Sequence, residues 1–244
     1  MDAISMNGLQ TKKITIDEGT QALILQNVSA SAVVKVTIQK EGFDDVKPIP
    51  SMTVAKVIEL QSKMRALNTN KDFISQIVEV PNEDAATTEV YPLAMIHIGV
   101  DGEISLGEND LILVEFTSGL GKVTADCNVK PLGGNRIASK VVDMKKLTYQ
   151  ASKDEKMIEL AGIDYLGFDT VPDEISLFYE TEIKRVDALA LKALNNDNFG
   201  LVRVNKGVNE YGTSNIYLLN VQEVVKCVVK DETQVQDFDI ITIS

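Results

Sequence analysis

The sequence predicts a mainly β protein built from two antiparallel β-sandwiches with short flanking helices. Three observations support this fold class. Apolar and polar residues alternate in many short segments, turn-forming residues separate those segments, and the order of elements repeats once within the 244 residues. Because Trp is absent and aromatics make up only 5% of the chain, Val, Ile and Leu must form the core, and β-branched side chains suit pleated surfaces.

Strand-like segments occur along the whole chain. Ile14 and Ile16 alternate with polar neighbours, and Val123–Val129 alternates in the same way, which gives one face to a core and one to water. Further strands are expected at Leu23–Val28, Val34–Ile38, Phe73–Val80, Leu93–Val100, Leu111–Thr117, Ile175–Glu180, Leu201–Val204, Ile216–Val229 and Asp239–Ile243. Turn chemistry between them, such as Asp101-Gly102, favours a sandwich over a parallel α/β sheet.

Two segments have helical spacing instead. Apolar residues recur every three or four positions in Thr53–Leu67, which ends before Asn68-Thr69-Asn70, and in Ile183–Leu194, which ends before Asn195–Asn198. Both segments are expected to be amphipathic helices that lie beside a sheet and turn their apolar stripes inward. The stripes consist of Val54, Val57, Ile58, Met64 and Leu67 in the first helix, and of Val186, Leu189, Ala190, Ala193 and Leu194 in the second.

The two helices also reveal a possible internal repeat. In the first half, Gln21–Val28 and Val33–Gln39 precede the helix, and in the second half Lys156–Ala161 and Glu174–Glu180 do so. The halves close with the apolar segments Asp110–Ser118 and Asp237–Ser244, and a glycine-rich run, Gly119–Gly134, follows the first of these. We therefore expect an N-terminal sandwich over residues 1–120 and a C-terminal sandwich over residues 121–244.

Charge excludes some functional classes. The formal net charge is −12, whereas a nucleic-acid-coating surface needs clustered Lys and Arg. The longest basic runs are pairs such as Lys12-Lys13, so direct binding of nucleic acid is not expected. No apolar segment reaches the length of about 20 residues that spans a bilayer, and the N-terminus lacks a signal-peptide pattern. The protein is therefore expected to be made and assembled in a cytosol.

Candidate catalytic residues are few. His97, the single histidine, lies in an apolar segment, where a hydrogen-bonded core or edge role is expected, and any Ser-His-Asp or Cys-His arrangement would have to include it. Cys127 and Cys227 match no metal-ligand spacing and are expected to be reduced, half-buried thiols, with a disulfide as the alternative. The sequence therefore predicts no catalytic, cofactor-binding or metal-binding residues and no enzymatic activity.

Glycine-rich and acidic segments do not change this interpretation. Gly119–Lys122 and Gly133–Arg136 lack the full phosphate-loop spacing and are expected to be turns. The carboxylates of Asp44-Asp45, Glu83-Asp84, Glu108/Asp110, Asp231-Glu232 and Asp237/Asp239 are expected mainly on a solvated surface. A glycosidase pair among them leaves little local signature, but a chain without Trp lacks the usual sugar-stacking ring. Glu108-Asn109-Asp110 remains an alternative as a weak Ca²⁺ loop, although no EF-hand pattern surrounds it.

The layout resembles the double jelly-roll major capsid proteins of tailless, membrane-containing bacteriophages. The paired segments Gln21–Leu67 and Lys156–Leu194 carry the resemblance, together with the closing strands Leu111–Thr117 and Asp239–Ile243. The resemblance implies a virion protein whose homotrimers tile an icosahedral shell over a lipid vesicle, in contact with other virion proteins. It brings no catalytic residue with it.

A non-enzymatic binding or adhesion module, such as a phage tail, baseplate or carbohydrate-binding β-sandwich, is the alternative function. For a capsid subunit, lateral contacts between sandwich walls would carry the function, with Met1–Gln10 and the loop Pro81–Thr88 reaching to neighbours. With −12 charges per subunit, repulsion should oppose assembly at low salt and be screened at roughly 0.1 M.

Overall fold

The computed structural model describes residues 4–5, 12–26, 28, 31–67, 77–81, 90–100, 102–118, 128–153, 155–199, 216–233 and 236–244. The chain divides into two compact units, Met1–Asp143 with Val202–Thr213, and Met144–Leu201 with Ser214–Ser244. Within the described residues, no helix has the length and apolar character needed to cross a membrane.

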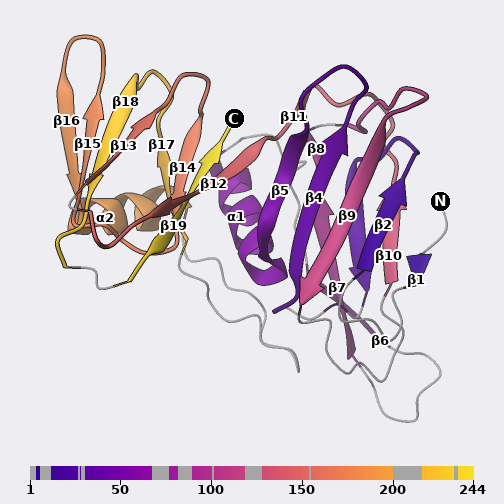
Figure 1. The fold of residues 1–244 in the computed structure, drawn as a ribbon. Helices are drawn as coiled ribbons and strands as arrows, with labels where there is room; N and C mark the ends of the chain where they lie inside the picture. Colours follow the sequence, from indigo (N-terminus) through magenta and orange to yellow (C-terminus); the bar gives the residue numbers. More distant parts are fainter. Residues whose placement is uncertain are drawn as a thin grey trace. The chain divides into compact units, whose positions relative to one another are not determined.

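Among the described residues, the first unit holds one helix and eleven strands, most of which are labelled in Figure 1. In chain order these are β1 (Ile4–Ser5), β2 (Lys12–Ile16), β3 (Ala22–Gln26), β4 (Val33–Gln39), β5 (Val46–Thr53), α1 (Val54–Leu67), β6 (Ile77–Pro81), β7 (Val90–His97), β8 (Gly99–Val100), β9 (Leu111–Ser118), β10 (Asn128–Leu132) and β11 (Lys140–Val141).

Two antiparallel sheets form the sandwich of the first unit. One has the strand order β1-β10-β3-β7-β6, the other has the order β2-β9-β4-β5, and β8 pairs with β11 in a small third sheet. Alternate residues of each sheet face the core, including Leu23 and Leu25 from β3 and Val34 and Val36 from β4, all with no exposed surface. The inward set is branched and aliphatic, as the composition predicts.

The chain leaves the first unit between Asp143 and Met144. The sequence places the boundary between residues 120 and 121, and residues 119–127 lie outside the described part of the chain. The strands that follow, β10 and β11, pair with β3 and β8 of the first unit. Of the stretch Met1–Gln10, Ile4–Ser5 forms β1 against β10, and of the loop Pro81–Thr88 only Pro81 is described, at the end of β6.

Helix α1 begins where β5 ends. Thr53 Oγ1 accepts a hydrogen bond from Lys56 N at 3.3 Å, so the threonine caps the first turn. The buried apolar residues of this helix are Val54, Val57, Ile58, Leu60 and Met64. The predicted first helix is confirmed, as are Val54, Val57, Ile58 and Met64 of its inward stripe, whereas the side chain of Leu67 lies outside the described part of the structure.

As far as it is described, the second unit repeats this plan with one helix and eight strands. These are β12 (Met144–Tyr149), β13 (Glu155–Glu159), β14 (Tyr165–Phe168), β15 (Glu174–Phe178), β16 (Ile183–Asp187), α2 (Ala188–Phe199), β17 (Tyr217–Asn220), β18 (Lys226–Lys230) and β19 (Phe238–Ile243). One sheet has the order β12-β19-β14-β17 and the other has the order β13-β18-β15-β16.

The path of the chain between the sheets is that of a jelly roll. In the second unit, successive strands alternate between the two sheets except at the hairpin β15–β16, after which α2 leads back to the first sheet. In the first unit, β4–β5 is the corresponding hairpin and α1 follows it in the same place. Both units therefore have the predicted fold class, a jelly-roll-like antiparallel sandwich with a flanking helix.

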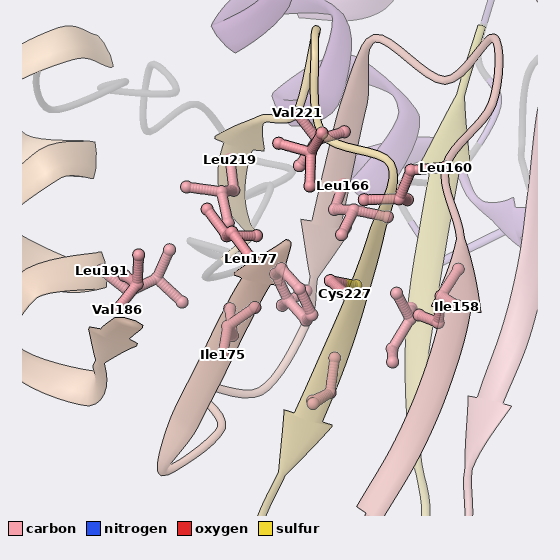
Figure 2. Packing of buried hydrophobic residues seen from close by; sticks show 14 of the residues in the cluster. Ile158, Leu160, Leu166, Ile175, Leu177, Val186, Leu191, Leu219, Val221 and Cys227 are labelled. Atoms are coloured by element: carbon pink, nitrogen blue, oxygen red, sulfur yellow. The ribbon is translucent and has the colours of Figure 1, made fainter. Parts of the chain in front are cut away.

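Branched aliphatic side chains from both sheets fill the core of the second unit. Figure 2 shows Leu166 of one sheet and Leu177 of the other, with Val186 and Leu191 at the side where β16 meets α2. Tyr149 of β12 stacks on Phe238 of β19, with ring centroids 4.7 Å apart. Its hydroxyl donates to Lys153 O at 2.9 Å and accepts from Asp231 N at 3.1 Å. The buried phenol thus stays hydrogen-bonded, as burial requires.

The prediction for the second helix is wrong at its start and on its inward face. Ile183–Asp187 is strand β16, paired with β15, and Asp187 Oδ1 accepts from Ala190 N at 2.7 Å to cap a helix that begins at Ala188. Leu189 is 76% exposed, and Leu191 is the buried leucine of the helix. Ile183 and Val186 are three positions apart, which is a helical spacing, so the segment was placed in the helix although the two side chains lie on opposite faces of β16.

Candidate interaction surface

His97 is buried, and its backbone is hydrogen-bonded to a side chain of helix α1. It ends β7, is 7% exposed, and its backbone is bonded to the side chain of Gln61 on α1: Gln61 Nε2 donates to His97 O at 2.7 Å, and His97 N donates to Gln61 Oε1 at 3.0 Å. These bonds join the helix to the sheet. The position matches the hydrogen-bonded role that the sequence predicts for this residue.

Cys227 lies in the core of the second unit. It is free and has no exposed surface, with Ile158 and Leu177 opposite it on the neighbouring strands. Burial raises the pKa of the Cys227 thiol to about 12, so at neutral pH the residue is an uncharged thiol and a poor nucleophile. Cys127 lies outside the described residues.

The second glycine-rich segment is a packed turn. Gly134 N donates to Glu103 Oε2 at 3.0 Å, and Glu103 N donates to Arg136 O at 2.8 Å. A Cβ on Gly102 would lie 2.7 Å from Ala138 N and would overlap the Arg136 carbonyl, so the two backbone segments can touch because residue 102 has no side chain. Gly133–Arg136 is therefore a turn that packs inside the first unit. Gly119–Lys122 lies outside the described residues.

The loop Glu108-Asn109-Asp110 uses its polar atoms internally. Asp110 Oδ1 accepts from Glu41 N, and Oδ2 accepts from Gly107 N, both at 2.9 Å, while Asn109 Nδ2 donates to Glu41 Oε2 at 2.7 Å. These backbone bonds hold the pKa of Asp110 below its usual value. The loop is therefore a turn stabilised by its own carboxylate.

Three aspartates of the second unit likewise hold loops by accepting hydrogen bonds from the backbone. Asp173 Oδ2 accepts from Glu232 N at 2.8 Å, Asp237 Oδ1 accepts from Ala151 N at 2.9 Å, and Asp169 Oδ1 accepts from Asp239 N at 3.1 Å. Asp44 and Asp45 lie in an exposed turn, and Glu83-Asp84 lies outside the described residues. Among the residues that the structure describes, no three His, Cys, Asp or Glu side chains are grouped to hold a metal ion.

The most distinctive surface is the solvent side of the sheet β13-β18-β15-β16, which we call the outer face. It is made of the residues that alternate with the core positions. Its rows across the sheet are Glu159–Lys226–Phe178–Ile183, Met157–Val228–Ser176–Arg185 and Glu155–Lys230–Glu174–Asp187. Met157 is 61% exposed and Ile183 is 60% exposed, each on one edge strand of this sheet.

Charged side chains surround these apolar groups. Lys226 Nζ lies 5.2 Å from the centre of the Phe178 ring, a cation–π distance. Lys230 pairs with Glu155 at 3.8 Å, and Arg185 pairs with Glu174 at 3.9 Å. A face of alternating charges with apolar side chains at its borders is suited to protein–protein contact and has no arrangement for bond-making chemistry.

Sequence reasoning assigned no role to the outer face. Ile183 was placed in a helix, so its position on an edge strand was missed, and Met157 was placed correctly in a strand without any sign of exposure. The segment Ile183–Asp187 has no regular apolar alternation, so the sequence carried no clear signal for this edge strand.

Comparison with known proteins supports the fold. No family model matches the sequence, and no curated protein matches it. Among solved structures, the chain is similar to the major capsid protein P2 from bacteriophage PM2, with a TM-score of 0.57 and 10% sequence identity over 99% of this chain and 96% of that chain. The chain therefore has the fold of a phage major capsid protein over both of its jelly rolls.

Proposed function

We propose that this protein is a virion structural protein, the major capsid subunit of a bacteriophage. The observation that carries the proposal is the pairing of two jelly rolls, each with a helix after its hairpin, in a fold shared with a phage major capsid protein over 99% of the chain. We take each compact unit as one domain of the subunit. The candidate catalytic groups support a non-enzymatic role, since His97 and Cys227 serve packing and hydrogen bonding.

In this proposal the subunit acts as a homotrimer that tiles an icosahedral shell in the virion, after assembly in the host cytoplasm. Its partners are further copies, other virion proteins and an underlying lipid membrane, with no direct contact to the genome. The net charge of −12 supports the last point, because the protein would repel nucleic acid.

Light scattering after size-exclusion chromatography, with electron microscopy of the same fractions, tests the proposal. We expect trimers that form sheets or shells, and we expect assembly to increase as salt is raised through roughly 0.1 M, where repulsion between acidic subunits is screened. Deletion of Met1–Gln10 should weaken assembly more than folding. A protein that stays monomeric at every salt and at high concentration, and that binds a glycan, would instead support the adhesion module.

A further inference from the structure

We propose that the two edges of the sheet β13-β18-β15-β16 bind each other between copies of this chain, so that β16 of one copy adds to β13 of the next. The inference rests on the proposed coat function and specifies one surface through which subunits recognise each other. The occupant of each edge is thus a second copy, and the contact is a shared antiparallel sheet.

Both edges present unused backbone groups. Tyr179 N donates to Glu182 O, and Ala188 N donates to Asp173 O. In an antiparallel pair, residues that bond inward alternate with residues whose N–H and C=O point away. Ile183, Arg185 and Asp187 therefore direct their backbone outward, and no strand pairs with them within the described residues.

The same alternation applies to the opposite edge. Leu160 N donates to Val225 O at 3.0 Å, so Ile158, two residues earlier, also bonds inward to β18. Glu155, Met157 and Glu159 direct their backbone groups outward. Their side chains lie on the outer face, as do those of Ile183 and Arg185, so the two edges can meet with matching side-chain orientation.

The edges are complementary in charge and in apolar character. The β13 edge carries exposed Glu155 and Glu159, and the β16 edge carries exposed Lys184 and Arg185. The charges of opposite sign are held by backbone groups, since Lys156 Nζ donates to Thr148 O and Asp187 caps α2. Glu155, Lys184 and Arg185 make ion pairs within the subunit, with Lys230, Glu182 and Glu174, and these exposed pairs can exchange for pairs with the next copy. Each edge also exposes one large apolar side chain, Met157 or Ile183.

One register satisfies both features. The sheet has four strands that alternate in direction, so its edge strands run oppositely and lateral repetition of the subunit brings β13 and β16 together antiparallel. Placing Met157 opposite Ile183 of the next copy puts Glu155 opposite Arg185 of that copy, because antiparallel partners shift in opposite directions. All four residues belong to the outward-bonding set, so this register also permits backbone hydrogen bonds.

The distribution of proline favours the second unit over the first for such a contact. Five of the six prolines, Pro48, Pro50, Pro81, Pro92 and Pro131, lie in strands of the first unit, and Pro172 lies between β14 and β15. Proline lacks an N–H and blocks strand addition at an edge. The strands of the second unit, as described, contain none, so their edges keep every backbone donor.

Charge reversal in the full chain tests the inference. Sedimentation velocity at about 0.15 M salt should show association weakened by about tenfold in Glu155→Lys and in Arg185→Glu. The double variant, Glu155→Lys with Arg185→Glu, should recover association to within about threefold of the parent, because the ion pair re-forms with reversed sign. Glu108→Lys makes the same charge change in an exposed turn of the first unit and serves as the control.

The double variant excludes a purely structural explanation. Residues 155 and 185 lie on opposite edges of one sheet, with β18 and β15 between them, so recovery cannot come from contact within one copy. If the parent associates and the single variants associate equally well, or if the double variant shows no recovery, the inference is wrong while the coat function stands. A parent protein that never associates would overturn both.

Discussion

Gln61 of α1 completes the hydrogen bonding of the last residue of β7, His97, by both donating to its carbonyl and accepting from its N–H. Within the described residues, strand β6 pairs with β7 over Val90–Ala94. Beyond that point the side-chain amide takes the place of a neighbouring strand for one residue. A primary amide is suited to this position because it carries one acceptor and a donor group at the spacing of a peptide.

Replacing Gln61 with Ala should therefore destabilise the first unit. The change leaves two buried backbone groups without their partner, at about 1–3 kcal/mol for each. Gln61→Glu should be at least as harmful at neutral pH, because it buries a carboxylate and sets one of its oxygens against the His97 carbonyl in place of a donor. His97→Gln, which leaves the backbone bonds in place, is the control. Urea unfolding monitored by circular dichroism measures all three, and an unfolding midpoint for Gln61→Ala equal to that of the parent would contradict this account.

The close approach of Gly102 to Gly133–Arg136 predicts a second effect. Gly102→Ala should lower the melting temperature strongly, because the new methyl group would overlap backbone atoms that cannot move without breaking the Glu103–Arg136 hydrogen bond. Gly107→Ala is a matched control, since its Cβ would meet the nearest atom at 3.4 Å. Differential scanning calorimetry should show a near-parental transition for the control only, and similar transitions for both variants would refute the packing argument.

The two helices should respond differently to a buried charge. Val57 is 1% exposed, so Val57→Asp should cost a few kcal/mol by placing a carboxylate in the core of the first unit. Leu189→Asp makes a comparable change on α2, where the side chain is 76% exposed, and should alter stability by less than about 0.5 kcal/mol. Chemical denaturation of both variants would measure this contrast. Equal losses of stability would mean that one of the two helices faces the other way.

Cys227 should behave as a buried thiol. In a Cys127→Ala background, a thiol reagent at pH 8 should label the native protein very slowly and the urea-unfolded protein at the normal rate, because native Cys227 is inaccessible and its pKa is raised to about 12.

The raised pKa of the Cys227 thiol also predicts how the stability of the fold changes at alkaline pH. A thiol whose pKa is higher in the folded state favours folding while it is protonated. Its contribution is complete below the ordinary pKa of the unfolded thiol, 9.0, and is lost as pH rises toward 12. Cys227→Ala should therefore reduce the slope of stability against pH in that interval. A slope identical to that of the parent would show that the thiol ionises alike in both states.

The fold class could be predicted from the sequence, but not every strand and its limits could be. β4 and β9 were predictable because one buried face imposes strict alternation. β5 was missed because Pro48 and Pro50 look like helix-preceding residues, although an edge strand tolerates proline. The segment Ile216–Val229 was read as one strand, but the turn at Val221–Val225 divides it into β17 and β18.

The repeat was also shifted by one strand. The sequence patterns of the two halves matched β9 with β19. The strand orders of the sheets instead match β9 with β18 and β10 with β19. Both β9 and β19 are long apolar segments, and apolar content alone does not say which sheet a strand joins. The outer face was invisible for a related reason, since exposure of Met157 and Ile183 depends on where the sheet ends.

The position of β19 has a consequence for biosynthesis. Phe238–Ile243 inserts between β12 and β14, so the sheet that begins at Met144 stays split until a segment about ninety residues later arrives. The first unit completes its corresponding sheet with β10, at Asn128–Leu132, well before the second unit has been translated. During synthesis one sandwich can therefore close early, whereas the two half-sheets of the other keep open edges until Phe238–Ile243 has been made.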